Sequence, residues 1–371
     1  MDARRVLRWG LVECRVATPF ARSARERRSR PSARPRSWLE TAAFGVATCL
    51  VLVVGCGPAV TTSPTPTGAV STSPTRAGSV STSPLPEGAV TDDHVLDVLT
   101  FNAALLPEPV VSTRQTARVR AMAPHLVGYD VLVLQEVFVD AWREGLLEAL
   151  GDAYPYRTEV VGQDGARGFW LRQDGGIVIL SRWPIVRQSY VLFESTCSGT
   201  DCLADKGVAY AAVRKGAFTY HVFATHAQSD YGWPIAPRTR ADQFALMRAF
   251  VDNLNLPPDE PVLLAGDFNV DAWTPERDAM LAALNAAWPP LVGPLRNTWD
   301  PSRNAWAYGR AHWIDYVLFS VEHAVPVAAW NRAVALKDGP LDLSDHFAVW
   351  GRLVMAHGSA APPPPWVPPA P

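Results

Sequence analysis

Apolar residues gather in short runs between residues 94 and 356, and turn-forming polar residues separate the runs. Near-continuous apolar runs are typical of strands buried in a core. They predict strands at 94–102, 130–137, 175–182, 207–215, 217–227, 261–269, 312–320 and 346–355. Amphipathic runs predict helices at 140–150, 237–254 and 274–286, the last with Thr274 as a candidate cap and Pro275 at its first position. Many strands with few helices favour two packed sheets flanked by helices.

The first 55 residues differ from the rest of the chain. Residues 1 to about 40 are rich in arginine, and residues 41–55 form an apolar stretch shorter than the roughly 20 residues that a spanning helix needs. This pattern is typical of an export signal. The stretch ends in Val-Val-Gly-Cys, which resembles a bacterial lipobox, so Cys56 would carry a lipid anchor. The alternative is an uncleaved N-terminal anchor, because the arginine-rich flank is long for a signal peptide unless the start codon is misassigned.

A ten-residue unit then repeats from Ala59 as AVTTSPTPTG, AVSTSPTRAG and SVSTSPLPEG. Because the repeat is rich in Ser, Thr and Pro and poor in large apolar residues, it predicts an extended tether. The C-terminal APPPPWVPPAP predicts a polyproline II tail. We therefore predict four segments: a leader with a signal sequence at 1–55, a linker at 56–92, a single catalytic domain at 93–356 and a Pro-rich tail at 357–371.

Charge becomes informative once the leader is set aside. The first 55 residues hold 11 of the 34 Lys and Arg residues and 4 of the 36 Asp and Glu residues, which leaves 23 basic and 32 acidic residues and a net charge of −9. A nucleic-acid-binding protein usually presents a basic face to the phosphates, whereas this chain has three lysines in all. We therefore expect no nucleic-acid partner.

Cysteine usage agrees with export. Cys197 and Cys202 are the only cysteines beyond Cys56, and oxidising conditions outside the cytoplasm favour a disulfide between them. The alternative is a pair of free thiols in a loop. Zinc binding by so isolated a pair is not expected.

Five short polar motifs end a predicted strand or precede one. They are Phe101-Asn102, Gln135-Glu136, Thr225-His226, Gly266-Asp267-Phe268-Asn269 and Ser344-Asp345-His346. Buried strands would deliver these carboxylate, amide and imidazole groups to one rim of a sheet. The set predicts a metal-dependent phosphodiesterase site.

Glu136 is the strongest single candidate for a metal ligand, because an ionised carboxylate at a buried strand end is costly unless a cation compensates it. Taken alone, Glu136 could equally be a salt-bridge partner, and Asn102 could be an ordinary turn residue. Asp267 and Asn269 alternate across Phe268, so they would point to the same face if the strand continues through them. The alternative for this motif is a tight turn.

Ser344-Asp345-His346 places a carboxylate next to an imidazole before a strand. One of the two could set the protonation of the other, or both could face a reacting water. Because adjacent residues on a strand diverge, a direct bond between Asp345 and His346 is not predicted. His226 ends a different apolar strand and could join the same site.

Read in order, LTFNAALLP, LQEVF, GGIVILSRWPI, CLADKG, THAQSD, GDFNV, TWD, WIDYVLFS and SDHFAV resemble the endonuclease/exonuclease/phosphatase superfamily, and most closely the bacterial neutral sphingomyelinases. GDFN, DYV and SDH mark only the superfamily. The pieces that resemble sphingomyelinases in particular are Tyr154-Pro155-Tyr156, Gly175-Gly176-Ile177 with Trp183-Pro184-Ile185, and the cysteine loop leading into Ala204-Asp205-Lys206-Gly207. The resemblance covers the whole domain and implies a DNase I-like α+β fold, a four-layer α/β/β/α sandwich of two mixed β-sheets flanked by helices.

The resemblance also implies an activity: hydrolysis of sphingomyelin to ceramide and phosphocholine by an activated water. Glu136 and Asn102 would hold a divalent cation, most simply Mg²⁺, that polarises the phosphodiester. His346 would be the general base, supported by Asp345. The remaining implied roles are binding of the phosphoryl oxygens by Asp267, Asn269 and His226, and support of the site by Asp315.

Loop aromatics near these motifs predict contact with a membrane interface, and they are Tyr231, Trp233, Trp273 and Trp306. The alternative is that these residues pack in the core. The chain also departs from the sphingomyelinases here, because they carry a longer aromatic hairpin than the segment 301–312 allows. Three rival functions stay open: a phospholipase C-like phosphodiesterase of the same fold, a nuclease, and a lipid-binding surface module without activity. We expect an exported or surface-anchored bacterial monomer.

Overall fold

Two six-stranded sheets form the centre of the computed structural model, which describes residues 93–356 except 108–112, 164–172, 231 and 233. The first sheet has the order β13 (Ala328–Val334), β16 (Ala348–Val354), β1 (Val95–Asn102), β2 (Val131–Gln135), β5 (Val178–Ser181) and β3 (Tyr156–Arg157). The second has the order β11 (Ala286–Ala287), β12 (Asp315–Ser320), β10 (Val262–Asp267), β9 (Phe218–His226), β8 (Gly207–Lys215) and β6 (Ile185–Leu192). All of these elements belong to the compact unit of residues 69–371.

Each sheet is mixed. The pairs β1–β2 and β9–β10 are parallel, and the other neighbouring strands are antiparallel. Two short pairs lie outside the main sheets, namely β4 (Gln173–Asp174) with β7 (Ala204–Asp205) and β14 (Lys337–Asp338) with β15 (Leu341–Asp342). Parallel pairs at the centre of both sheets matter for function, because they place several strand ends at the same edge.

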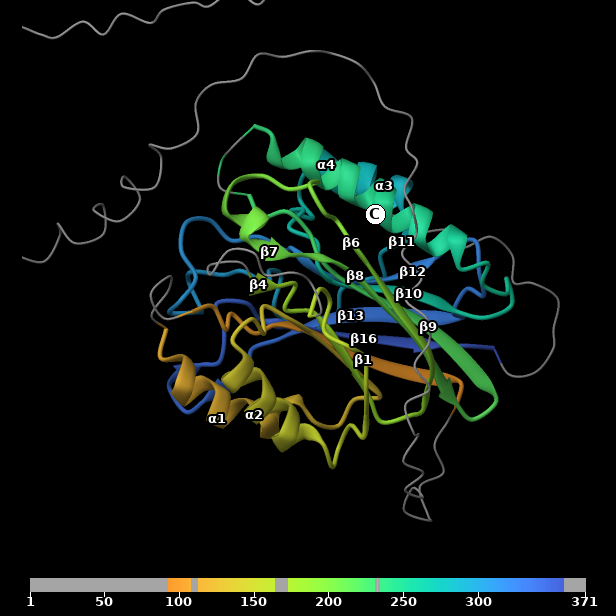
Figure 1. The fold of residues 1–371 in the computed structure, drawn as a ribbon. Helices are drawn as coiled ribbons and strands as arrows, with labels where there is room; N and C mark the ends of the chain where they lie inside the picture. Colours follow the sequence, from red (N-terminus) through yellow and green to blue (C-terminus); the bar gives the residue numbers. More distant parts are fainter. Residues whose placement is uncertain (1–92, 108–112, 164–172, 231, 233, 357–371) are drawn as a thin grey trace, which may run out of the picture. The chain divides into compact units, whose positions relative to one another are not determined.

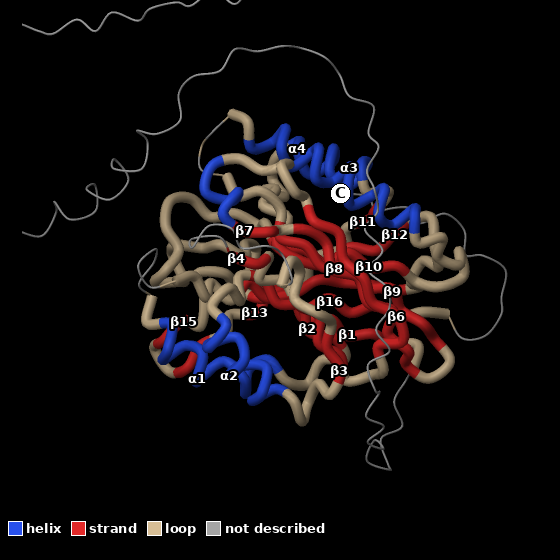
Figure 2. The backbone as a smooth tube through the Cα atoms, in the orientation of Figure 1, coloured by secondary structure: helices blue, strands red, loops and turns tan. Residues whose placement is uncertain are grey.

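Helices cover the outer face of each sheet (Figure 1). The first sheet is covered by α1 (Gln115–Leu126) and α2 (Asp140–Leu150), and the second by α3 (Ala236–Asn253) and α4 (Pro275–Ala283). Figure 2 shows the strands between these two helical layers. The predicted α+β sandwich of two mixed sheets flanked by helices is confirmed.

The strands of the first sheet are buried on both faces. Along β1, Leu96 and Val98 point toward the second sheet, whereas Leu99 and Phe101 join the cluster that includes Met122 of α1. This alternation follows from the two-residue repeat of a strand. Burying each such side chain contributes roughly 1.5–3 kcal/mol, which explains why apolar runs marked these strands in the sequence.

The structure matches the predicted elements unevenly. The predicted helix 140–150 coincides with α2, and Pro275 begins α4 as predicted. Thr274 does not cap α4, because its hydroxyl donates to the Asp271 carbonyl oxygen, 2.8 Å away. Sequence patterns missed α1, because its buried face includes the polar Gln115 and Arg118 and the helix contains Pro124.

The sequence patterns also missed several two-residue strands and two long ones. Strands β6 and β13 lie at sheet edges, and their half-exposed residues form no continuous apolar run. Within the described ranges, no helix is long and apolar enough to cross a membrane. The predicted leader, lipobox at Cys56, linker and Pro-rich tail lie outside the described residues.

Candidate active site

Strand ends from both sheets meet at one edge and bring the predicted polar residues together. The parallel strands β1 and β2 end next to Asn102 and Glu136, and β9 and β10 end at His226 and Asp267. The antiparallel strands β12 and β16 begin at the same edge, β12 with Asp315 and β16 two residues after His346. Register sets the closest neighbours, because Asp267 pairs with His226 on one side and with Asp315 on the other.

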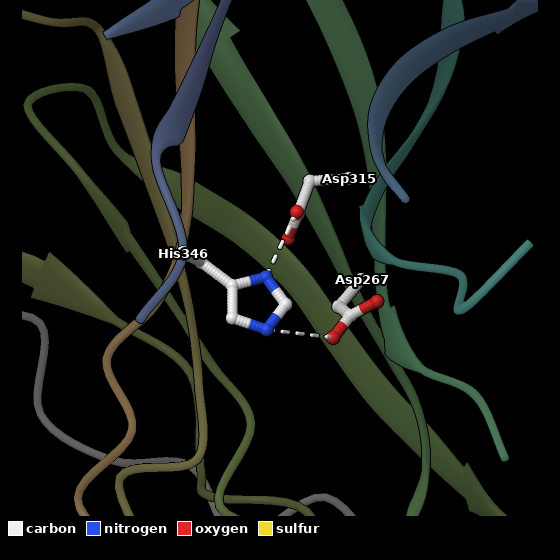
Figure 3. A group of neighbouring side chains, drawn as sticks. All are labelled: Asp267, Asp315 and His346. Carbon is white, nitrogen blue, oxygen red and sulfur yellow. Dashed lines mark hydrogen bonds and ion pairs between the residues drawn. The ribbon is translucent and has the colours of Figure 1, made fainter. Parts of the chain in front are cut away.

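The Oδ2 atom of Asp267 lies at the centre of this group. It accepts a hydrogen bond from the Asn102 side-chain amide at 3.1 Å. It is also 3.6 Å from Nε2 of His226 and 3.8 Å from Nε2 of His346. Figure 3 shows the His346 imidazole and the Asp267 carboxylate facing each other. Residues that are far apart in the sequence therefore converge on one carboxylate oxygen.

The His346 imidazole is held by Asp315. Its Nδ1 atom lies 2.9 Å from Oδ2 of Asp315, and both side chains are buried (Figure 3). Burial opposes protonation of the ring, but the charge and hydrogen bond of Asp315, with the charge of Asp267, raise the pKa of His346 well above its usual range. A proton on Nδ1 leaves Nε2 directed at the centre of the site.

Carboxylates crowd the other side of the site. The Asn102 amide nitrogen also donates to Oε1 of Glu136 at 3.1 Å, so it bridges Glu136 and Asp267. Burial and the nearby Asp345 raise the pKa of Glu136 to about 6, although 16% of its side chain is exposed. Burial and Asp315 raise the pKa of Asp267 to about 7. These carboxyl groups resist ionisation together unless positive charge is added between them.

Asp345 does not bind the neighbouring imidazole. Its side chain is half-buried, and its Oδ1 lies 3.2 Å from the Ser344 hydroxyl. The Ser344 hydroxyl in turn donates to the Asn102 carbonyl oxygen at 2.6 Å and accepts the His346 backbone N–H at 3.1 Å. Asp345 therefore acts on the site through its charge, while Ser344 joins the end of β1 to the start of β16.

The strand does not continue through the GDFN motif, which corrects the prediction that Asp267 and Asn269 share a strand face. Strand β10 ends at Asp267, and Asn269 adopts a left-handed backbone with φ 54°. The Asn269 N–H instead donates to Oδ1 of Asp267 at 2.9 Å, and its amide donates to the Ala227 carbonyl oxygen at 3.1 Å. A turn, and not strand alternation, directs Asn269 to the site.

Backbone strain is concentrated at the same edge. Glu136 has φ 57°, an uncommon conformation for a side chain of this size. Gly266 has φ 145°, and a Cβ atom there would lie 2.0 Å from the Thr225 carbonyl oxygen. Only glycine fits between β9 and β10 at this point, immediately before Asp267.

Sequence reasoning missed Lys206 as a site residue. Its buried ammonium group donates to Oδ2 of Asp201 at 2.7 Å and lies 3.2 Å from Nε2 of His226. Burial and the charge of Lys206 lower the pKa of His226 well below its usual value, so this imidazole is neutral. The ADKG segment was noticed as a family marker, but nothing local in it shows that the lysine faces His226.

The predicted disulfide between Cys197 and Cys202 is present and closes the loop that contains Asp201. The carboxylate of Asp201 also accepts the Ser229 backbone N–H at 2.8 Å, three residues after His226. The disulfide loop thus places Asp201, and through it Lys206, behind His226.

Arg118 is a second residue without a sequence signal. Its buried guanidinium donates to the carbonyl oxygens of Ala103 at 2.8 Å and Leu343 at 2.9 Å. These carbonyls lie just after Asn102 and just before the Ser344-Asp345-His346 segment. Arg118 therefore fixes the two loops that carry site residues from the first sheet.

The predicted membrane-contact residues fall into different environments. Trp273 has 54% of its surface exposed, as an interfacial anchor requires. Trp306 is half-buried, and its indole donates to the Asp342 carbonyl oxygen at 3.0 Å. Tyr231 and Trp233 lie outside the described residues.

The donor set fits a hard divalent cation. In the described part of the chain, Asp267, Asp315 and His346 can present ligand atoms within 4.8 Å of one another. This group does not coincide with the predicted pair Glu136 and Asn102. We favour the Glu136 side, because Asp315 and His346 are already bonded to each other, whereas Glu136 and Asp267 face each other across one amide group with raised pKa values. Oxygen-rich sites of this kind suit Mg²⁺.

Comparisons with known proteins agree with this geometry. The signature of the Endonuclease/Exonuclease/phosphatase family matches residues 99–346. Sphingomyelinase C of Listeria ivanovii is 30% identical over 260 residues, which cover 62% of this chain and 77% of that protein. Sphingomyelinase C 2 of Leptospira interrogans is 32% identical over 289 residues, covering 69% of this chain but 46% of the relative, so the chain spans about half its length.

Solved structures show the same likeness. The crystal structure of sphingomyelinase C from Streptomyces griseocarneus has a TM-score of 0.64 and 34% identity, covering 70% of this chain and 99% of that one. A beta toxin variant from Staphylococcus aureus with bound magnesium ions has a TM-score of 0.62 and 27% identity, covering 69% of this chain and 98% of that one.

Proposed function

The chain belongs to the endonuclease/exonuclease/phosphatase family, and from this and its site we propose that it is a metal-dependent phosphodiesterase that hydrolyses sphingomyelin to ceramide and phosphocholine. The observation that carries the proposal is the convergence of His346, held by Asp315, on the Asp267 carboxylate beside Glu136. The identity of the substrate is inferred from the relatives named sphingomyelinase C.

Glu136 and Asn102 would hold the divalent cation, with Mg²⁺ as the first candidate. When bound, the cation would polarise the phosphodiester and offset the carboxylate charge that raises the pKa values around it. Asn102 orients Glu136 through its amide, and the left-handed backbone at Glu136 turns the side chain into the site.

In its neutral form, which a cation bound beside Asp267 would favour, His346 acts as the general base. Asp315 holds the proton on Nδ1, so Nε2 accepts the proton of the attacking water. A bond forms between the water oxygen and phosphorus, the bond from phosphorus to the ceramide oxygen breaks, and that oxygen leaves with the electron pair and takes up a proton. Asp345 supports the base through its negative charge, without contacting the ring.

Neutral and positive donors bind the phosphoryl group. Asn269 and His226 lie beside Asp267, Asn269 offers amide N–H groups, and the Lys206 ammonium next to Nε2 of His226 adds positive charge. Such prearranged groups stabilise the charge that builds on the phosphoryl oxygens.

Export and anchoring belong to the same proposal. The apolar stretch before Cys56 and the Ser/Thr/Pro repeats support a catalytic domain tethered to the outside of a bacterial cell by a lipid on Cys56. A Cys56→Ser variant should move the protein from the membrane fraction to the medium, and unchanged membrane retention would favour an uncleaved anchor.

The activity test measures phosphocholine release from sphingomyelin vesicles by the full chain, with Mg²⁺ or with EDTA, alongside His346→Ala. We expect Mg²⁺-dependent release that the variant lacks. A folded protein that releases nothing from sphingomyelin or phosphatidylcholine would contradict the proposal.

A second candidate activity is hydrolysis of phosphatidylcholine. It is favoured by a Staphylococcus aureus relative named phospholipase C, which is 30% identical over 271 residues. Release from phosphatidylcholine vesicles at a rate equal to or above that from sphingomyelin would support it.

A further inference from the structure

An aromatic pair lies against the general base but has no part in the proton transfer. The ring of Trp299 packs edge-on against the His346 imidazole, with centroids 5.2 Å apart and planes at 79°. Tyr308 packs against Trp299 in the same way, at 5.3 Å and 82°. Tyr308 is 74% exposed, which is unusual for an ordered aromatic side chain. The two rings therefore form a continuous aromatic surface from the His346 imidazole to the solvent-exposed face of Tyr308.

Hydrogen bonds hold Trp299 and the backbone of Tyr308 in place. The backbone of Trp299 exchanges two hydrogen bonds with His312, at 3.0 and 2.9 Å, and its indole donates to the Tyr308 carbonyl oxygen at 2.8 Å. The loop between the rings is joined to the base, because the Asn304 amide donates to the Ser344 carbonyl oxygen at 2.8 Å. Trp299 and the loop that carries Tyr308 therefore have a fixed position relative to His346 before any ligand binds.

Other aromatic groups of the protein hold cations of the chain itself. The guanidinium of Arg352 lies 5.7 Å from the Trp330 ring and 5.3 Å from the Trp350 ring. The ammonium of Lys215 lies 5.4 Å from the Trp183 ring. Among the described residues, no side-chain cation lies in this way over Trp299 or Tyr308, so these two rings are available to a cation from outside.

We propose that Trp299 and Tyr308 form the aromatic wall of a subsite for the quaternary ammonium group of the substrate. The inference rests on the proposed function, which supplies a phosphocholine head group. In that head group, one oxygen and two carbons separate phosphorus from nitrogen, so the ammonium must bind close to the residues that act on phosphorus. Trp299 contacts one of these residues directly. Perpendicular aromatic rings attract a quaternary ammonium through their π faces.

The test compares two soluble esters, p-nitrophenyl phosphocholine and its neutral isostere p-nitrophenyl 3,3-dimethylbutyl phosphate, with the full chain and Mg²⁺. Soluble esters remove any contribution from membrane contact. We expect Tyr308→Leu to raise KM for the choline ester by about 3- to 30-fold, to leave KM for the isostere unchanged, and to be rescued by Tyr308→Phe, because a ring and not the hydroxyl is required. Tyr129→Leu is the matched control. Tyr129 lies before the start of β2, at the end of that strand opposite to Glu136, and is therefore remote from the site.

Every other outcome would overturn the inference that Trp299 and Tyr308 form a subsite for the quaternary ammonium group. Equal losses on both esters would mean that Tyr308 acts by positioning His346, and a loss confined to vesicles would mean membrane contact. No change on either ester would also refute the inference. If the wild-type protein cleaves neither ester, the proposed function itself is in question. Calorimetry of phosphocholine with the wild-type protein then decides the subsite: binding that Tyr308→Leu weakens supports it, and no binding rejects it.

Discussion

Asp315 holds the His346 imidazole, with its Oδ2 atom 2.9 Å from Nδ1, although Asp345 is the carboxylate next to His346 in the sequence. The two partners stand at the starts of strands in different sheets, since Asp315 begins β12 and His346 lies two residues before β16. The proton-transfer geometry therefore depends on how the two sheets are stacked, and a change at either strand end should affect the base.

Asp315→Asn should lower kcat by about 100- to 10,000-fold. An asparagine amide can donate to Nδ1 of His346, which would place the imidazole proton on Nε2 and block the base. The apparent pKa of the base in the pH–rate profile should fall, because Asp315 is the main group that raises the pKa of His346. Hydrolysis of a soluble ester over a range of pH measures both effects.

Asp345→Asn is the control for this prediction. It keeps the bond between Asp315 and His346, so the loss of kcat and the shift of the profile should both be smaller. A larger effect for Asp345→Asn than for Asp315→Asn would show that the bond seen here does not orient the base.

Cation binding should stabilise the protein through Glu136. A ligand that binds only the folded state raises the free energy of unfolding by about 2.7 kcal/mol at 100 times its Kd. We expect Mg²⁺ to raise the Tm of the wild-type protein, and Glu136→Gln to remove most of that rise together with the activity. Calorimetric melts with Mg²⁺ and with EDTA test this, and an equal rise in Tm for the variant would place the cation elsewhere.

Stability should fall in acid where Asp201 becomes protonated. Burial alone would raise the pKa of Asp201, but the charge and hydrogen bond of Lys206, with the Ser229 N–H, lower it to about 2 from the ordinary 3.8. The folded state therefore favours the ionised form, so this stabilisation is complete above about pH 4 and is lost as pH falls toward 2. The shift corresponds to roughly 2 kcal/mol, of which about half should be lost by pH 3.

Urea unfolding of the wild type and of Asp201→Asn/Lys206→Met at pH 5 and pH 3 measures this contribution. The double variant removes both charges and avoids a buried unpaired lysine. The wild type should lose about 1 kcal/mol more than the double variant between the two pH values. Equal losses would mean that the pair contributes nothing to the acid dependence.

Gly266→Ala should destabilise the protein by at least about 3 kcal/mol, because the new Cβ would overlap the Thr225 carbonyl oxygen and the residue has φ 145°. Displacement of the adjacent Asp267 should reduce activity even in the folded fraction. Gly145→Ala is the control: nothing lies within 4 Å of a Cβ at this position in α2, and alanine should stabilise the helix by about 0.5–1 kcal/mol. Denaturant unfolding of both variants gives the comparison, and similar stabilities would contradict the close approach at Gly266.

Local patterns in the sequence determined much of this protein. Apolar runs marked the strands that end near Asn102, Glu136, His226 and Asp267, because burial on both faces requires continuous apolar sequence. The same patterns missed α1, where buried Arg118 and Gln115 interrupt the apolar face. The likeness to a known family, carried by its motifs, supplied the fold and the proposed activity.

Tertiary structure alone decided which of these groups touch. The pairing of His346 with Asp315, the approach of Lys206 to His226 and the packing of Trp299 on His346 all join different strands or loops. Residue spacing in the sequence cannot show such contacts, because they depend on sheet register and on how two sheets stack, which long-range packing sets. The turn at Asn269 is the local counterpart: a side chain that strand periodicity assigned to one face reaches the site through a left-handed backbone instead.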